Sequence, residues 1–578
     1  KAIFNESEPE TSGIGGAIDV LGNDCKFINV TSVNNTAYRG GSTFVRGDNT
    51  IIKDCILDNN TATLRGGGLN IAGDNCTVNN ISVSNNKAGT MGGGLYILSN
   101  GTTINGITAD NNTAERGGSA FINGTNVKVQ NGELNNNRAI YNESRNDTTG
   151  LGGGFDIVGD NILVDNVHSN NNTAYRGGST FIRGNNVTVS NCNLDNNTAD
   201  LRGGGLNVGG DNCTFENLTI SNCNATEQGG AVYVIGNNNV FNNVTSVNNT
   251  AKNGGSSYIE GDNNTVRNCI LDNNNATENG GGLFVKGNNC TFENVDISNC
   301  NALEGGAAFV RGNNTYFDNI TSKNNTADIF GGSTAVYGNN VTVENSILTD
   351  NYAGDSGGAI YVDGHNSTFS NNNISSNEAP GTGGGIYIVG DDCEFNNNQI
   401  SNNNANIGGA IGVYGGNNTS FTNNTITFNN ATSRGGAIYV EGDGQGDIAY
   451  FTNNNISSNH AGLSGGGMYI AEVTVELDQI YGYNNTALRG GFADVYKGYE
   501  VTVENSTFIS NHALGDIADG NGIGGGFLIT GSNNVDVQAD FYNNTATNGS
   551  AIYVGDTVGL SIHDSKLYDN QAHSYYLL

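Results

Sequence analysis

Hydrophobic residues in this chain alternate with polar ones over short stretches that are separated by turn residues. In the segment that starts at Gly358, Ile360 and Val362 are apolar and Tyr361 lies between them, and Phe369 follows after a glycine-containing turn. A period of two is typical of β-strands, because successive side chains of a strand point to opposite faces. The pattern therefore predicts short strands, with Ile360 and Val362 in a core and Tyr361 pointing outward.

The same pattern recurs along the whole chain, and a glycine pair marks each recurrence. With the second glycine of each pair as position zero, the markers run from Gly16 to Gly525, Ser550 takes the last place, and nearly every interval is 25 to 27 residues. Such a period is typical of solenoids, in which each coil buries its core by stacking on its neighbours. We predict an all-β fold, a right-handed parallel β-helix (β-solenoid) of about 21 coils with 25–27 residues per coil, continuous over residues 1–578.

Asparagine recurs at position 19 of the coil, for example at Asn35, Asn60, Asn86, Asn112 and Asn137. Stacked at one corner, these amides are expected to form hydrogen bonds from coil to coil, and asparagine also tolerates a left-handed backbone. The glycine pairs are expected to permit positive φ and close backbone approach. Both features are interpreted as structural.

Three segments break the period, near residues 139–151, 442–449 and 513–523. Insertions in solenoids are often binding sites, although loops that are merely tolerated are an equally simple interpretation. The candidate binding residues in these loops are Glu143, Arg145, Asp147, Asp516 and Asp519.

The motif Gly357-Gly358-Ala359-Ile360 followed by Phe369-Ser370-Asn371 resembles the polymorphic outer membrane protein repeat. The Asn-rich and Thr-rich composition of the repeat, as in Val33-Asn34-Asn35-Thr36-Ala37, is most similar to that of the adhesin-like surface proteins of methanogenic archaea. This resemblance extends over the whole chain and implies a β-helix displayed on a cell surface. Because no leader or anchor segment is visible in the sequence, we expect the chain to be a section of a longer surface protein.

The charge of the chain narrows the range of partners. The formal net charge is −32, and Lys and Arg together number only 23. Nucleic acids and anionic membrane surfaces both attract clustered positive charge, so neither is an expected partner. No run of about 18 apolar residues is present, and we therefore expect no membrane span in this chain.

Arginine nevertheless recurs two residues before the glycine marker, and it forms a predicted stripe at one corner. The stripe comprises Arg39, Arg65, Arg116, Arg176, Arg202, Arg434 and Arg489. Pairing with neighbouring carboxylates or backbone carbonyls is the structural interpretation, and contact with an anionic glycan or another partner is the functional one.

Asn-x-Ser/Thr sequons are abundant, and those at position 18 are the best candidates for N-glycosylation because they precede the inward asparagine. These are Asn34, Asn111, Asn248, Asn324 and Asn484.

Aspartate after a turn glycine, as in Gly47-Asp48-Asn49, makes calcium the one cofactor worth considering, but turn chemistry explains the same residues. No other metal site and no catalytic residue is predicted.

The ten cysteines contain no close Cys-x-x-Cys pair. Reduced core thiols are the favoured interpretation, and disulfides across a corner, such as Cys55 with Cys76, remain the alternative.

Taken together, the repeats favour a non-catalytic, extracellular adhesin-like protein, a stalk at the cell surface that attaches to other cells, surface glycans or proteins. The alternative is a structural subunit of a filament or surface coat, formed by end-to-end stacking of solenoids. A polysaccharide-degrading enzyme is the third hypothesis, because many right-handed β-helices act on pectin. Such an enzyme would concentrate acidic and basic side chains in one groove, whereas these coils are monotonous.

Overall fold

The computed structural model describes residues 2–3, 5, 7, 12–443, 446–515 and 520–572, with the side chains of residues 146 and 147 left out. The chain divides into two compact units, Lys1–Gly287 and Asn288–Leu578. Both are parallel β-solenoids, and together they contain about 21 coils. The described residues contain no α-helix. The predicted fold class is confirmed, and one continuous β-helix over residues 1–578 stays a prediction.

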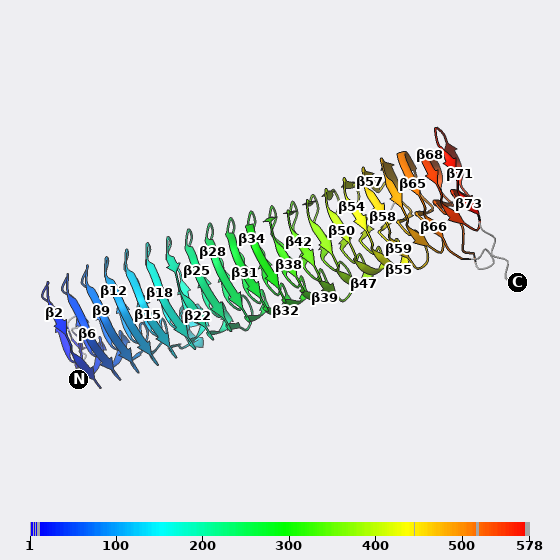
Figure 1. Cartoon of the computed structure of the whole chain (residues 1–578). Coiled ribbons are helices and arrows are strands. Elements are labelled where there is room, and N and C mark those ends of the chain that lie inside the picture. Colours follow the sequence, from blue (N-terminus) through cyan, green and yellow to red (C-terminus); the bar gives the residue numbers. More distant parts are fainter. Residues whose placement is uncertain are drawn as a thin grey trace. The chain divides into compact units, whose positions relative to one another are not determined.

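Each coil contributes strands to three parallel sheets, which we call B, C and A in chain order. In the coil that starts at Gly93, β11 (Leu95–Ile97) belongs to sheet B, β12 (Thr103–Asp110) to sheet C and β13 (Thr113–Ala114) to sheet A. In sheet B these coils stack without a shift in register, since Leu95 lies opposite Leu69 of the coil before and Ala120 of the coil after, whereas sheet A contains bulges such as the one between Ala37 and Arg39. Within each unit, Figure 1 shows equivalent strands of successive coils side by side.

Sheet B matters most for the site, because its strands follow the glycine markers directly. In the first unit these strands are β1 (Ile18–Val20), β5 (Thr43–Val45), β8 (Leu69–Ile71), β11, β14 (Ala120–Ile122), β17 (Phe155–Ile157), β20 (Thr180–Ile182), β24 (Leu206–Val208), β27 (Val232–Val234), β30 (Ser257–Ile259) and β33 (Leu283–Val285). In the second unit they are β36 (Ala308–Val310), β40 (Thr334–Val336), β44 (Ile360–Val362), β48 (Ile386–Ile388), β52 (Ile411–Tyr414), β56 (Ile438–Glu441), β60 (Met468–Ala471), β64 (Ala493–Tyr496), β67 (Phe527–Thr530) and β70 (Ile552–Gly555).

The glycine pair is required by the stacking of the coils. Gly357 has a φ of 69°, which is left-handed and favours glycine. A Cβ atom on Gly358 would lie 2.1 Å from the carbonyl oxygen of Gly384 in the next coil. The first glycine therefore makes the turn and the second lets the coils approach.

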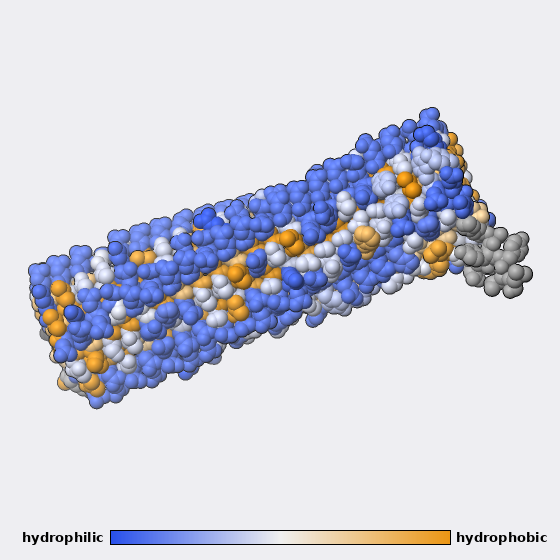
Figure 2. Space-filling view, in the orientation of Figure 1, coloured by the Kyte–Doolittle hydropathy of each residue, from blue (hydrophilic) through white to orange (hydrophobic). Residues whose placement is uncertain are grey.

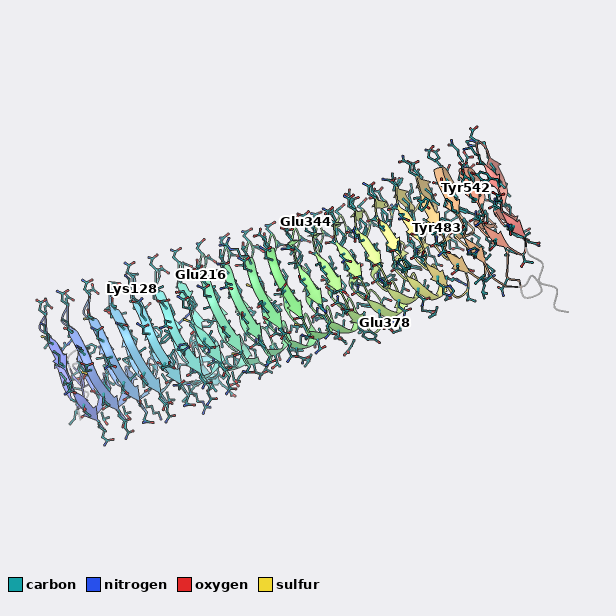
Figure 3. All side chains as sticks on the ribbon, viewed as in Figure 1. Lys128, Glu216, Glu344, Glu378, Tyr483 and Tyr542 are labelled. Carbon is teal, nitrogen blue, oxygen red and sulfur yellow. The ribbon has the colours of Figure 1, made fainter. Side chains whose placement is uncertain are left out.

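Apolar side chains of all three sheets fill the interior, as the alternation predicts. In the second unit, Phe369, Phe395, Phe421 and Phe451 form a continuous stack with ring centroids 4.8 to 5.0 Å apart, and each is fully buried. Such aromatic pairs stabilise by about 0.5–1.5 kcal/mol beyond the burial of their area. Charged side chains project outward, for example Lys128 and Glu216 in the first unit (Figure 3).

The predicted asparagine ladder is confirmed. The backbone N–H of Asn86 donates to Oδ1 of Asn112 at 3.0 Å, and Nδ2 of Asn112 donates to Oδ1 of Asn137 at 2.9 Å. The backbone part of that prediction was wrong, because the left-handed residue is the preceding one, such as Asn111 with a φ of 54°. The inward asparagine makes the hydrogen bonds, and its exposed neighbour makes the turn.

A second ladder, at position 14 of the coil, was not foreseen. In the second unit, Asn372, Asn398, Asn424 and Asn454 are buried and linked in the same way, with backbone N–H to Oδ1 distances of 2.8 to 2.9 Å. The recurrence of asparagine five residues before each inward asparagine of the first ladder, as in Asn372 before Asn377, was the signal that would have revealed them. In the first unit, apolar residues such as Cys55 and Ile81 take this position.

The exposure predicted for the outward residues of sheet B was also wrong. Tyr361 alternates with Ile360 and Val362 as expected, yet only 8% of it is exposed. It stacks on Phe330 with ring centroids 4.6 Å apart and also lies against Tyr337 and Tyr387. Side chains outside the coil therefore form a second packed layer over sheet B.

Candidate functional site

This outer layer consists of two columns of side chains, which we name together the arginine–aromatic strip. One column holds the residues two positions before the glycine markers, and the other holds those three positions after them. The first column is aligned by isolated backbone bridges, such as Arg65 to Met91 and Met91 to Arg116 in the first unit. The predicted arginines therefore do lie on one line within each unit.

Arginines of the strip in the first unit lie over aromatic rings. The guanidinium of Arg65 is 5.2 Å from the ring centroid of Tyr96 and donates to its hydroxyl at 3.1 Å. Arg202 repeats the arrangement on Tyr233, at 4.9 Å and 3.0 Å. Cation–π contacts of this kind contribute about 0.5–2 kcal/mol, the larger values applying where water is excluded. Arg39 and Arg176 lie over the adjacent rings of Tyr38 and Tyr175, at 5.9 and 5.7 Å.

Two coils of the first unit place a carboxylate in the strip, at Asp19, which forms an ion pair with Arg46, and at Asp156. Asp156 on β17 is fully buried, Nε of Arg116 donates to its Oδ2 at 2.7 Å, and Nη2 of Arg183 contacts both of its oxygens at 3.0 Å. Burial raises the pKa of Asp156 to about 7, although the charge of Arg116 acts in the opposite direction. Two arginines are thus held around one internal carboxyl group.

The second unit has the same elements in a different arrangement. Arg434, the last residue of β55 (Asn430–Arg434), lies 5.0 Å from the ring centroid of Tyr469 on β60. Asp494 on β64 occupies the position equivalent to Asp156 and is 5% exposed. Burial raises the pKa of Asp494, although the charges of Arg489 and Arg434 act in the opposite direction. Arg489 bridges Ser464 and Ile523 through its backbone.

A pocket of about 330 Å³ opens between these residues, which places it at the small end of the range typical for ligand sites. Its polar lining is made by Arg434, Arg489, Asp494 and the two tyrosines Tyr469 and Tyr496. Ile523 and Leu528 contribute apolar surface. Burial raises the pKa of Tyr469 to about 12, so its hydroxyl keeps its proton at neutral pH and remains a hydrogen-bond donor. The pocket can therefore bind an anion, hydrogen-bond to hydroxyl groups and contact an apolar surface.

A second surface depression, of about 260 Å³, lies on sheet C of the first unit. It exists because Gly106 and Gly132 have no side chains, and Asn131, Glu133 and His168 are among the residues around it.

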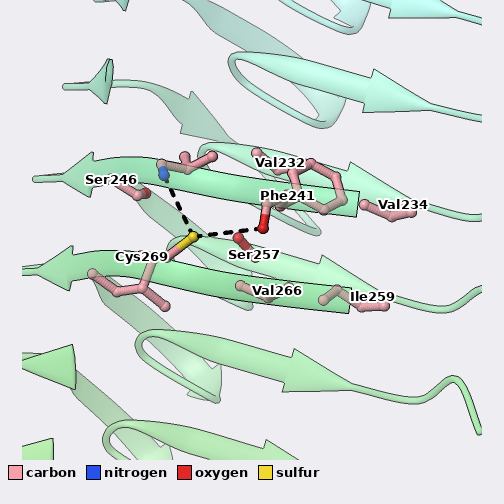
Figure 4. A pocket seen from close by; sticks show the side chains of 10 residues that line it. Val232, Val234, Phe241, Ser246, Ser257, Ile259, Val266 and Cys269 are labelled. Atoms are coloured by element: carbon pink, nitrogen blue, oxygen red, sulfur yellow. Dashed lines mark hydrogen bonds between the residues drawn. The ribbon is translucent and has the colours of Figure 1, made fainter. Parts of the chain in front are cut away.

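The cavities found in the interior of the described residues are small and apolar. Figure 4 shows one of about 20 Å³, where the buried thiol of Cys269 lies among Val232 and Phe241. Burial raises the pKa of Cys269 to about 11, which leaves this thiol protonated and unreactive.

The predicted binding loops are only partly described. Glu143 and Arg145 lie in a 3-10 helix, η1 (Glu143–Thr148), and Arg145 forms an ion pair with Glu115 of the preceding coil. Tyr141 stacks on Tyr175, with ring centroids 3.9 Å apart, so this loop is docked on the first unit. The side chain of Asp147 lies outside the described residues, as do Asp516 and Asp519 entirely. In the loop at 442–449, the described backbone N–H of Asp443 donates to Asp447 at 2.8 Å.

All five candidate sequons present an exposed asparagine with a left-handed backbone. The φ angles are 60° at Asn34, 54° at Asn111, 57° at Asn248, 56° at Asn324 and 55° at Asn484. Their side chains contact the neighbouring coil, as when Nδ2 of Asn111 donates to Asn85 at 2.8 Å. They are accessible for glycosylation, which stays a prediction.

All ten cysteines are free thiols, and only Cys25 is partly exposed. In the described ranges, no group of three or more His, Cys, Asp or Glu side chains is arranged to hold a metal ion, and calcium binding stays untested. No described helix is long and apolar enough to span a bilayer. The face seen in Figure 2 is largely hydrophilic, with hydrophobic residues gathered in broken bands.

Sequence reasoning found the arginines and missed Asp156 and Asp494. Both stand at a position where most coils have an aromatic or apolar residue, so a carboxylate there was a visible exception. The period alone could not show that this outward position is buried.

A family model described as a right-handed beta helix region matches residues 281–445. The chain is a β-helix repeat protein. No curated protein sequence matches it. Among solved structures it is similar to the A-module of the mannuronan C-5 epimerase AlgE6 of Azotobacter vinelandii, with 12% identity, a TM-score of 0.21, and coverage of 86% of this chain and 91% of that one. It is also similar to the PL6 family alginate lyase AlyGC, with 11% identity, a TM-score of 0.23, and coverage of 97% and 98%.

At these identities and TM-scores the two likenesses to solved structures carry no information on the activity of this β-helix repeat protein. The finer resemblance, to polymorphic outer membrane protein repeats and archaeal adhesin-like proteins, also stays a prediction.

Proposed function

We propose that this β-helix repeat protein is a non-catalytic, adhesin-like protein located outside the cell, where it attaches to other cells or surfaces through their glycans or proteins. The observation that carries the proposal is the arginine–aromatic strip, which repeats in register from coil to coil within each unit. Arg65 with Tyr96 and Arg202 with Tyr233 show this repetition in the first unit.

A surface whose arginine–aromatic pairs recur at several coils suits a partner that also repeats, such as a polysaccharide or a dense array of surface molecules. Several weak contacts then add up to strong attachment through effective concentration.

The proposal is tested by coating beads with the purified chain and measuring their adhesion to cells and to a glycan array. We expect adhesion that free protein inhibits. In parallel, the chain is incubated with alginate, pectin and other uronate polymers, and the release of new chain ends is followed. Depolymerisation would show an enzyme and overturn the proposal, and so would beads that bind neither cells nor any glycan.

Antibody labelling of intact cells tests the extracellular location. The alternative of a filament or surface coat stays a prediction, and electron microscopy of the purified chain separates single particles from filaments.

A further inference from the structure

The pocket of the second unit lies where the aromatic column of the strip is interrupted for two coils, before the column resumes at Tyr553. Tyr439 and Tyr469 stack with ring centroids 5.2 Å apart, and the next two coils carry Asp494 and Leu528 at the same position. Arginines of the strip at Arg65, Arg202 and Arg434 all lie over an aromatic ring of the following coil. For Arg489 the residue at that place is Leu528. The missing ring leaves the space that the pocket occupies.

The two arginines of this pocket have no anion of their own. Within the described part of the chain, neither Arg434 nor Arg489 forms a side-chain hydrogen bond or an ion pair, and Nε of Arg489 is buried without a partner. Nε of Arg65, Arg183 and Arg202 is likewise buried without a partner outside the pocket, so the unpaired atom by itself does not mark a site. What sets Arg489 apart is the open space beside it, from which a ligand can offer the guanidinium a hydrogen-bond acceptor.

The first unit shows one arginine of this strip paired with a carboxylate. There Arg116 of the strip and Arg183, which lies five residues after the marker Gly178, both bind the carboxylate of Asp156, at 2.7 and 3.0 Å. In the second unit Asp494 stands at the equivalent position, but no ion pair joins it to either arginine among the described residues. A carboxylate supplied from outside would complete in the second unit the arrangement that Asp156 makes internally in the first.

The rest of the lining narrows the class of ligand. Asp494 offers carboxylate oxygens that accept hydrogen bonds from hydroxyl groups. Tyr496 is 40% exposed and presents a ring, and Ile523 and Leu528 add apolar contact. A bare sulfate or phosphate would use the arginines alone. A sugar ring that carries a carboxylate would use the arginines, the acceptor and the apolar wall together.

We propose that this pocket binds the acidic sugar unit of a saccharide, a pyranose ring that carries a carboxylate, as uronic acids do. The carboxylate lies between Arg434 and Arg489, ring hydroxyls donate to Asp494, and the C–H face of the ring packs against Tyr496. This inference deepens the proposed attachment function and rests on it in one respect, namely that the ligand is bound and not transformed.

The test uses the full chain and isothermal titration with trimers of mannuronate, glucuronate and galacturonate. Each trimer is compared with its methyl ester, which keeps the ring and removes the charge, and with sodium sulfate. We expect at least one acid trimer to bind, its ester to bind about tenfold more weakly or less, and sulfate to compete poorly. Absence of binding by all three trimers at about 10 mM would overturn the proposal, as would equal binding of acid and ester or of acid and sulfate.

Three variants locate the site. Arg489→Gln should weaken binding about tenfold or more, since it removes one guanidinium from the carboxylate. Leu528→Tyr places at this position the residue that the following coil carries there, Tyr553, so it should fold normally and abolish binding by filling the pocket. The control is Arg267→Gln, which removes an exposed arginine of β31 (Thr265–Asp272) on sheet C, outside both the strip and the pocket, and should leave affinity unchanged. Unchanged affinity in both Arg489→Gln and Leu528→Tyr would refute the site.

The same variants separate this inference from the proposed function. If Leu528→Tyr loses the trimer but coated beads still adhere, the pocket stands as a saccharide site that is not needed for attachment. If beads adhere and no trimer binds, the inference fails and the attachment function stands. If the trimer binds but is cleaved or epimerised by the protein, the proposed non-catalytic function fails while the site remains.

Discussion

Removing one ladder asparagine should destabilise the first unit strongly, although no catalytic or binding residue is involved. Asn112 is fully buried, and its side chain makes four hydrogen bonds. Its Oδ1 accepts from the backbone N–H and from Nδ2 of Asn86, at 3.0 and 3.2 Å. Its Nδ2 donates to the carbonyl of Val83 at 2.8 Å and to Oδ1 of Asn137 at 2.9 Å. Asn112→Ala removes all four.

The size of the loss in unfolding free energy follows from which polar groups Asn112→Ala leaves without a partner. The backbone N–H of Asn86 and one of its amide hydrogens lose their acceptor inside the protein, and each buried donor left unpaired costs about 1–3 kcal/mol. The acceptors are better tolerated, since Oδ1 of Asn137 still accepts the backbone N–H of Asn112 at 3.0 Å. We therefore expect a loss of about 2–6 kcal/mol in unfolding free energy, concentrated in the coils next to Asn112.

The assay is urea unfolding followed by circular dichroism, combined with hydrogen exchange at the amide of Asn86. The matched control is Asn111→Gly, which keeps the left-handed turn and removes only an exposed hydrogen bond to Asn85, so it should change stability by less than about 1 kcal/mol. Asn112→Cys should cost less than Asn112→Ala, because Cys223 naturally occupies the ladder and donates to the carbonyl of Leu194 at 3.6 Å. Equal stability of Asn112→Ala and Asn111→Gly, with no faster exchange at Asn86, would refute the reasoning.

Three further outcomes are expected. Burial raises the folded-state pKa of Asp156 to about 7, so the folded protein binds this proton more tightly than the unfolded chain. The unfolding free energy of wild type relative to Asp156→Asn should therefore fall by on the order of 4 kcal/mol between about pH 4 and pH 7. An unfolding free-energy difference between the two proteins that does not change with pH would contradict this. Gly204→Ala should destabilise the protein by about 2 kcal/mol or more in urea unfolding, since its Cβ would lie 2.3 Å from the carbonyl oxygen of Gly230. Gly209→Ala in the same coil meets no atom closer than 3.4 Å and should be tolerated. An equal loss of unfolding free energy in both variants would argue against close coil packing. Native protein at mildly alkaline pH should expose about one reactive thiol, that of Cys25, to a disulfide reagent and the remainder only on unfolding, and several reacting at once would show that the core is open.

The sequence by itself determined the coil. A period of 25 to 27 residues, a two-residue alternation and a glycine pair in nearly every coil are sufficient, because stacking requires each register position to meet its own equivalent one coil away. The same argument predicted that Asn86, Asn112 and Asn137 would bond in a ladder. It failed on their backbone, since the period cannot show which of two adjacent asparagines makes the turn.

Only the tertiary structure decided what lies outside the coil. Alternation places Tyr361 and Asp494 away from the core, but their burial depends on side chains from the residues two positions before the glycine markers, which fold over sheet B from neighbouring coils. The angle of the turn between this column and sheet B is set by backbone geometry, and the pattern of residue types along the sequence does not determine that angle. For the same reason the arginine stripe was visible in the sequence, whereas the pairing of Arg116 with Asp156 and the unpaired state of Arg489 were not.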